Sequence, residues 1–436
     1  MPYFNWYIDR EAIPFSSPPF WDIDYSDPKH GNIICRDAWS HCDPWLLNEP
    51  GKTQDGQHRW TCYGEPVGES IPVITIPLSQ GWDPHNVTMI ARYLCNPIRK
   101  QVLDHDRAIL VINYSLEGFG PEVFLDFHRL VSTIGINPKK LIYVSGSMNI
   151  DGLYERWCVA NGISEDSRFR TAYDLCWMRS FSNGPDLEAI EKLKLPLSVE
   201  LTNKHPRYVC LNRRLHLHRM LLLTMLEESG SISQGMVSMP ATISEDSHRS
   251  RDFLDEWYRY RNMAISDPEL RQRLDESAVR LYRSLPLSAD GADLNINLCL
   301  DLNPGLAAAP LSIITETHFF NELIFPSEKI WKPMAYGQAF IPVAARGYLI
   351  ELKNLGFGIF DQTIPVEFDY VYDHIERMTM ISNIIKRYSS MPENIYKSLS
   401  TSWKEDAEKN RKMICNRKLI RELSVRNLRK AIENDQ

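Results

Sequence analysis

The sequence lacks several features that mark membrane, secreted or nucleic-acid-binding proteins. It contains no apolar run near the roughly 20 residues that a membrane-spanning helix needs. Residues 1–6 show no basic region followed by an apolar one, so we expect no signal peptide. The formal net charge is -7, which gives no overall attraction to nucleic acid, although a local basic face stays possible. No internal repeat or low-complexity tract is evident.

Paired cysteines are absent as well. The nine cysteines are scattered, and none forms a Cys-x-x-Cys pair. Cys35, His41 and Cys42 could be offered as metal ligands, but no second closely spaced pair accompanies them. Isolated reduced thiols are the favoured interpretation, and they suggest a cytoplasmic protein.

The composition is that of a folded protein with more than one domain. The chain has 436 residues, of which 43% are hydrophobic and 24% charged. This length suggests two domains of ordinary size. We place an N-terminal domain at 1–200, a C-terminal domain at 201–390 and a helical tail, rich in Lys and Arg, at 391–436.

The first 72 residues are rich in Trp, Tyr, Pro and Asp and show no helical or strand period. We expect an irregular segment that packs on the first domain. Its exposed aromatic side chains could stack on sugars or bases. The favoured alternative is that they are buried anchors of a loop-rich segment.

An α/β pattern begins at residue 73. Strands are expected at 73–77, 108–114 and 141–146, and helices at 121–134 and 151–158. Strands that alternate with helices in this order imply a parallel sheet with right-handed crossovers. Ligands bind such sheets beyond the carboxyl ends of the strands.

The second domain is expected to follow a linker at 191–206. It begins with a strand at 207–211, which leads through a basic turn into a helix at 220–228. Arginines directly after a strand, at the start of a helix, can bind an anion, but they can equally be a solvated basic turn. These arginines are Arg213, Arg214 and Arg219. His216 and His218 lie among them and are expected to make polar contacts rather than bind metal.

A charged band at 247–284 follows, and we expect two helices there, at 251–263 and 268–285. The band interrupts the α/β pattern and therefore predicts an insertion on the sheet. A run of charges of this kind is most often a solvated helix face.

The segment 325–343 combines a helix start, a helix end and a buried strand. Ser327 is a candidate N-cap, and Glu328 falls in the first turn, where a carboxylate suits the positive end of the helix dipole. Pro333 is expected to kink or shorten the helix, and Gly337 to end it. The apolar run 339–343 fits a parallel strand that is buried on both faces. An anion at this helix start would meet free backbone N–H groups and the Lys329 ammonium.

Further elements are expected beyond this segment. We expect a strand at 311–315 before it, a helix at 348–355, a strand at 357–360 and a helix at 369–388. These elements would complete the α/β pattern of the second domain.

The run Ser-Glu-Lys-Ile-Trp at 327–331 and the strand Phe-Ile-Pro-Val at 340–343 resemble the donor-site motif of fucosyltransferase-type glycosyltransferases. The run Ile-Ile-Thr-Glu-Thr at 313–317 resembles the strand that precedes that motif. The resemblance implies the GT-B fold, in which two Rossmann-like α/β domains face each other across a cleft. It also implies that Glu328 holds the ribose of a nucleotide sugar, and that one of the arginines after 207–211 faces the donor phosphates.

Glycosyl transfer needs positive charge for the leaving diphosphate and a base for the acceptor hydroxyl. Lys329 and the arginines could neutralise the diphosphate, and Glu316 is a further carboxylate near them. The loop 115–120 follows the strongest strand, so Glu117 is our candidate base. Gly118 and Gly120 would let a ligand approach that loop closely.

We expect the transfer to need no metal and no cofactor besides the nucleotide sugar. Two Asp-x-Asp pairs occur, at 22–24 and 104–106, but neither follows a strand as a metal-holding pair should. A carboxylate base without a covalent nucleophile favours inversion at the anomeric carbon. The acceptor could be a glycan, a protein or modified nucleic acid. The alternative is a non-catalytic α/β protein that binds a phosphorylated ligand or nucleic acid.

Overall fold

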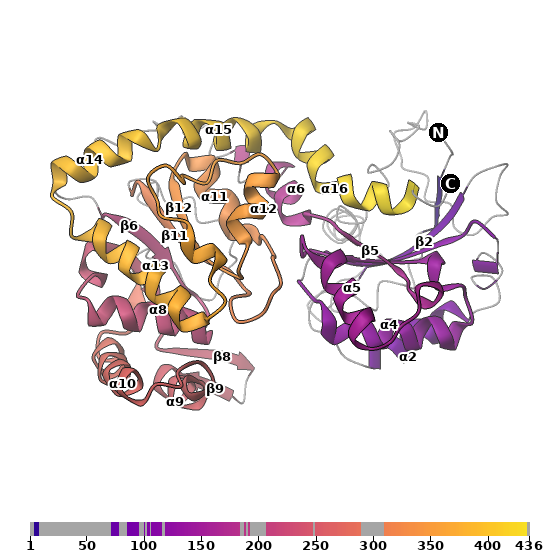
Figure 1. The fold of residues 1–436 in the computed structure, drawn as a ribbon, viewed down its shortest axis with the longest axis horizontal. Coiled ribbons are helices and arrows are strands. Elements are labelled where there is room, and N and C mark those ends of the chain that lie inside the picture. The colour runs from indigo at the N-terminus through magenta and orange to yellow at the C-terminus, as the bar shows by residue number, and fades with distance from the viewer. Residues whose placement is uncertain are drawn as a thin grey trace, which may run out of the picture. The chain divides into compact units, whose positions relative to one another are not determined.

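The computed structural model describes residues 4–7, 71–77, 85–95, 100, 103–104, 106–115, 118–183, 187–188, 191, 206–246, 249–288 and 309–433. The chain divides into two compact units (Figure 1). The first comprises Met1–Ser180 with Arg421–Gln436, and the second Phe181–Ile420. Both boundaries fall inside helices, α6 (Cys176–Asn183) and α16 (Arg417–Glu433). The last residues of the predicted tail thus belong with the first unit.

The first unit contains a parallel sheet with the strand order β1-β2-β3-β4-β5. Its strands are β1 (Phe4–Tyr7), β2 (Ile71–Pro77), β3 (Ile109–Tyr114), β4 (Leu141–Ser145) and β5 (Arg170–Tyr173). Neighbouring strands here follow one another in the sequence. Right-handed crossovers that all step in the same direction place their helices on one face of the sheet.

The helices of the first unit follow this rule. Figure 1 shows α2, α4 and α5 on one face of the sheet and α16 on the other. Their bounds are α2 (His85–Leu94), α4 (Pro121–Ile134) and α5 (Ile150–Ala160), with short 3-10 turns η4 (Pro138–Lys140) and η5 (Glu165–Ser167). The predicted helix at 121–134 is confirmed: Pro121 stands in its first turn, and Gly135 ends it in the left-handed conformation, with φ 65°.

The second unit contains a sheet with the order β10-β7-β6-β11-β12, parallel except for the edge strand β10. Its strands are β6 (Tyr208–Leu211), β7 (Gly235–Met239), β10 (Leu287–Ser288), β11 (Leu311–Thr315) and β12 (Ala339–Val343). The predicted α/β class with parallel sheets is therefore confirmed.

Helices cover both faces of this second sheet. Helix α8 packs with α10 and α13, whereas α11 packs with α15, and Figure 1 shows these two groups on opposite faces. The helices are α8 (Leu217–Glu228), α11 (Glu328–Tyr336), α12 (Tyr348–Asn354), α13 (His374–Ser389), α14 (Glu393–Ser402) and α15 (Lys404–Cys415), with 3-10 turns η6 (Ile232–Gln234) and η8 (Glu367–Tyr370). This sheet is doubly wound.

The predicted insertion lies between β7 and β10. It contains the two expected helices, α9 (Phe253–Ala264) and α10 (Pro268–Tyr282). It also contains an antiparallel hairpin that the sequence did not indicate, β8 (Thr242–Asp246) and β9 (Arg249–Asp252). Asp252 and Asp267 cap the two helices by accepting backbone N–H bonds.

Three predicted elements need correction. Residues 357–360 are buried but form no strand, because their backbone groups bond to α15: Gly358 N donates to Asn410 Oδ1 at 2.7 Å. The long helix begins at His374 rather than 369, since Asp373 provides its N-cap. Helix α11 continues to Tyr336 although Pro333 lies inside it, so the proline shortens it less than expected.

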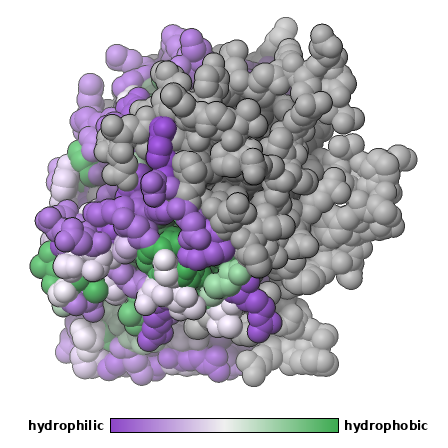
Figure 2. Space-filling model, turned by 90° about the vertical axis from the view of Figure 1, so that its right-hand side faces the viewer, coloured by the Kyte–Doolittle hydropathy of each residue, from purple (hydrophilic) through white to green (hydrophobic). Residues whose placement is uncertain are grey.

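Some predictions fall outside the described residues. They concern most of the aromatic-rich segment 1–72, most of the linker 191–206, and Glu117. Among the described residues in view in Figure 2, hydrophilic side chains predominate, and hydrophobic ones form several small areas between them. Within the part of the chain that the structure describes, every helix is too short or too polar to cross a membrane.

Candidate anion-binding site

In the sheet of the second unit, the strand order reverses between the neighbouring strands β6 and β11. The chain leaves β6 toward β7 on one side, and it later returns to β11 on the other side. Helices α8 and α11, which follow these two strands, therefore lie on opposite faces of the sheet. Open α/β sheets bind ligands at such switch points. In the first unit, the described strands follow in sequential order and form no switch point.

Hydrogen bonds fix the two strand ends to each other. Thr315 Oγ1, at the end of β11, donates to Asn212 Oδ1, just beyond β6, at 2.7 Å. Asn212 N donates to Ser238 O of β7 at 3.1 Å. Both Asn212 and Thr315 are buried. The polar network thus ties three neighbouring strands together where the arginine-rich turn begins.

Arg219 is the buried cation of this site. Its side chain is on α8, and the residue is only 4% exposed. Its Nη2 donates to Thr315 O at 3.4 Å, and its Nε has no hydrogen-bond partner among the described residues. Burial lowers the pKa of Arg219 to about 10, although the carboxylates of Glu328 and Glu316 act in the opposite direction. The guanidinium is therefore charged at neutral pH and has an unused donor.

The other two predicted arginines lie in the turn between β6 and α8. Arg213 is buried, at 9% exposure, whereas Arg214 is exposed. Of the three, Arg219 is the one that contacts β11 through a hydrogen bond.

Helix α11 begins where the sequence predicted. Ser327 is its N-cap, and its hydroxyl accepts from Lys329 N at 3.4 Å. Lys329 Nζ donates to Ser327 Oγ at 3.1 Å and to Glu328 Oε1 at 2.9 Å. Burial alone would raise the pKa of Glu328, but the charges of Lys329 and Arg219 outweigh it and keep this pKa below its usual value.

Glu316 holds the N-cap residue of α11 in place through hydrogen bonds. Its carboxylate accepts bonds from Ser327 Oγ, from Ser327 N at 3.3 Å and from Tyr348 OH at 2.7 Å. Its backbone carbonyl accepts from His218 Nε2 at 2.8 Å. Burial raises the pKa of Glu316, and Lys329 and these donors oppose that effect. Glu316 therefore positions Ser327, which in turn contacts Lys329.

Two histidines on and before α8 line the same region. The rings of His216 and His218 stack with their centroids 5.8 Å apart. Desolvation lowers the pKa of His216, and four neighbouring positive charges lower it further. These charges belong to Arg219, Lys329, Arg251 and Arg214. An anion placed among them would lie near these positive charges, which favour the binding of a phosphate group.

The structure thus brings five predicted residues into one network: Arg219, Glu316, Ser327, Glu328 and Lys329. Tyr348 and Arg251 were missed. Tyr348 follows β12, so only the pairing of β11 with β12 places it beside Glu316. His218 makes the polar contact that was expected, to Glu316 O, whereas the contact given for His216 is the stacking of its ring on that of His218. Among the described residues, no group of three or more His, Cys, Asp or Glu side chains could hold a metal ion.

The carboxyl end of the first sheet also carries polar side chains. Ser145 Oγ and Tyr143 OH both donate to Phe119 O, each at 3.0 Å, which fixes the described part of the loop after β3. Asp174, which follows β5, forms a buried two-bond ion pair with Arg179, at 2.7 and 2.9 Å. Because both carboxylate oxygens of Asp174 accept bonds from Arg179, this pair is suited to stabilising the fold of the first unit.

Comparisons with known proteins give distant likenesses. No protein-family model and no curated protein matches the chain. Among solved structures, it is similar to one described as trehalose-6-phosphate from E. coli bound with UDP-2-fluoro glucose, at 12% identity and a TM-score of 0.40, over 84% of this chain and 73% of that one. It is also similar to an alpha,alpha-trehalose 6-phosphate synthase from Burkholderia multivorans, at 10% identity and a TM-score of 0.40, over 84% of this chain and 71% of that one. The N-terminal domain of a Candida albicans trehalose-6-phosphate phosphatase is similar at 11% identity and a TM-score of 0.37, over 96% of this chain and 79% of that one.

Proposed function

We propose that this protein is a GT-B glycosyltransferase that transfers a sugar from a nucleotide-sugar donor to a hydroxyl acceptor. One observation carries the proposal. At the switch point of a doubly wound sheet, the buried Arg219 keeps an unused Nε donor, and both it and Lys329 act on Glu328. A buried donor without an acceptor costs roughly 1–3 kcal/mol, and a bound phosphate oxygen would remove that cost.

Each residue has a chemical role in this proposal. Lys329 and Arg219 neutralise the diphosphate as it leaves, which is why the transfer is expected to proceed without a metal. Glu328, whose pKa is lowered, is ionised at neutral pH and can accept hydrogen bonds from ribose hydroxyls. Glu316 and Ser327 position the start of α11 and its N–H groups. Glu117 lies outside the described residues, so its role as the base that deprotonates the acceptor hydroxyl stays a prediction.

A thermal-shift panel of GDP, UDP, CMP and their sugars tests the donor site. Binding to the folded state raises the melting temperature by an amount set by ligand concentration over Kd. We expect a rise with one nucleotide, and we expect Lys329→Ala to abolish it, since that variant removes the charge next to Glu328.

Lys353→Ala is the matched control. Lys353 is a lysine of α12 with a side chain 54% exposed, and it pairs with Asp361 at 2.6 Å, so its loss should leave the nucleotide shift intact. The nucleotide sugar that raises the melting temperature is then incubated with the protein. Slow release of free nucleotide from it would distinguish a transferase from a non-catalytic binding protein. A melting temperature unmoved by every nucleotide would contradict the proposal.

A further inference from the structure

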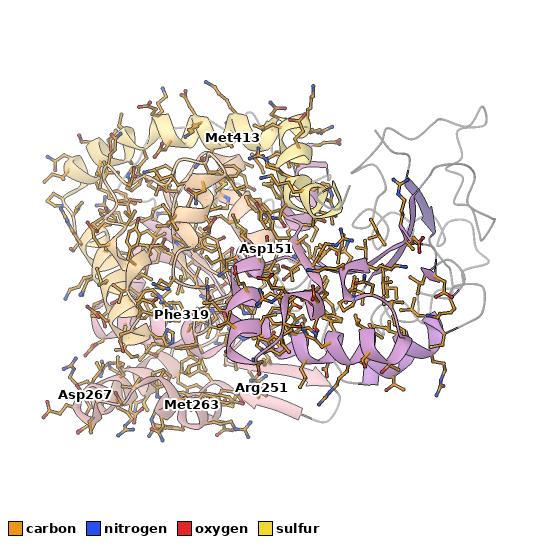
Figure 3. All side chains as sticks on the ribbon, turned by 45° about the vertical axis from the view of Figure 1, so that its right-hand side comes forward. Asp151, Arg251, Met263, Asp267, Phe319 and Met413 are labelled. Atoms are coloured by element: carbon orange, nitrogen blue, oxygen red, sulfur yellow. The ribbon has the colours of Figure 1, made fainter. Side chains whose placement is uncertain are left out.

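The hairpin β8–β9 projects from the same edge of the sheet as the candidate site. Only residues 240–241 separate β7 from β8, and β7 is the neighbour of β6. Arg251 pairs with Ile243 in the hairpin register, and Phe253 N donates to Ala241 O at 2.9 Å. Arg251, which Figure 3 labels, thus lies near the base of the hairpin, and the partner strand β8 begins three residues after the end of β7.

The Arg251 guanidinium is held in place from behind. Glu256 on α9 is only 2% exposed, and its carboxylate accepts a bond from Arg251 Nη2. The hairpin end is fixed as well, because Asp252 accepts from Leu254 N at 2.9 Å and from Tyr282 OH at 2.8 Å. The Arg251 side chain is nevertheless 30% exposed, so part of the guanidinium can meet a ligand.

The charges of the site come from three neighbouring strands. Arg251 lies in β9, on the hairpin that follows β7, whereas Arg219 lies on the helix after β6 and Lys329 on the helix after β11, and the spatial order of these strands is β7-β6-β11. All three charges act on His216, which lies just before α8. A ligand at the switch point is therefore approached from the β7 side by Arg251 and from the β11 side by Lys329.

We propose that Arg251, from the insertion, is a binding residue for the diphosphate group and faces it from the side opposite Lys329. This inference rests on the proposed function, because it takes a nucleoside diphosphate as the ligand. It assigns the helical insertion a direct part in the site, since α9 supplies the Glu256 carboxylate that positions Arg251.

Calorimetric titration with UDP and with GDP tests the inference. The wild type should bind one of them, and Arg251→Ala should weaken that Kd by about tenfold, as expected for the loss of one charge-assisted contact. Arg251→Lys should restore part of the affinity. Arg259→Ala is the matched control. Arg259 also pairs with Glu256, at 3.6 Å, but its side chain is 66% exposed. We expect the Kd of this variant for the nucleotide to stay within about twofold of the wild-type Kd.

A second variant separates ligand binding from folding. Arg251→Ala leaves the buried Glu256 carboxylate with only the longer contact to Arg259, at 3.6 Å, so the double variant Arg251→Ala/Glu256→Gln removes that charge too. The inference predicts that the double variant binds as weakly as the single one. Wild-type affinity in either variant would overturn the inference alone. Failure of the wild type to bind either nucleoside diphosphate would also overturn the inference, and the proposed function falls with it only if the thermal-shift panel gives no rise with any nucleotide.

Discussion

Single residues set the charge of the candidate site. Glu316 and Glu328 are both buried, but their environments shift their pKa values in opposite directions. Glu328 is bonded to Lys329 Nζ, whereas Glu316 is bonded to the hydroxyls of Ser327 and Tyr348. The charge of Lys329 acts on both carboxylates, but only Glu328 also accepts a direct bond from that ammonium and is acted on by Arg219, so burial dominates only at Glu316. One carboxylate is thus suited to ligand contact and the other to positioning.

Asp369 makes stability depend on pH. It is 3% exposed, and burial raises its pKa from 3.8 to about 6, although Leu349 N and Ile350 N donate to it. The folded state therefore holds this proton more tightly than the unfolded state. The stabilising contribution is complete below pH 3.8 and is lost as the pH rises through 6.

Asp369→Asn should remove this dependence. Between pH 4 and 7, the free energy of unfolding of the wild type should fall by about 2 kcal/mol relative to the variant, from a shift of roughly two pH units. Denaturant unfolding at a series of pH values measures the difference. Wild-type and variant curves that stay parallel across this range would contradict the explanation.

At the scale of elements, local signals were sufficient for α11 and its surroundings. The Ser327 cap, the Gly337 end, with φ 71°, and the buried strand after it all appear at the predicted residues. These features depend on contacts within a few residues, which a sequence displays directly. The same holds for the core face of α4, where Val123, Phe124 and Phe127 are buried.

Elements that depend on distant partners were mispredicted. The apolar run 357–360 has the pattern of a strand, but two side chains of α15 take its backbone bonds: Asn410 bonds both N and O of Gly358, and Asp406 accepts from Phe360 N at 2.8 Å. Phe360 also has a φ of 62°, which a strand does not allow. The hairpin β8–β9, which contains Arg251, was missed because its charged residues resembled a helix face.

Gly358→Ala should destabilise the protein by about 1–3 kcal/mol. An added Cβ would lie 2.5 Å from Asp406 Cγ and 2.7 Å from its Cβ, so backbone has to move. Gly152→Ala is the matched control: it lies within α5, and its Cβ would meet only Arg156 Nη1 at 3.6 Å. The control should gain up to about 1 kcal/mol from helix propensity. Equal melting temperatures for the two variants would contradict this packing.

At the scale of the molecule, strand order decides where a ligand can bind. The alternation of strands and helices predicts parallel sheets in both halves, and both occur. The alternation cannot show that the described strands of the first unit are sequential whereas the second unit has a switch point, because strand order depends on pairing between distant segments. The end of the chain gives another example: Arg170 Nη1 donates to Ala431 O at 2.8 Å, and Tyr173 N to Asn427 Oδ1 at 2.7 Å, so α16 completes the first unit.

Hydrogen exchange with and without a saturating nucleoside diphosphate tests the central claim most directly, namely that the switch point of the second unit binds the diphosphate. The two helix starts at this site, Leu217–Arg219 and Ser327–Ile330, should exchange more slowly when the ligand is bound, because binding to the folded state makes local opening of both helix starts less favourable. The amides of α4 in the first unit should be unchanged. Protection confined to the first unit, or no protection at either helix start, would contradict the account.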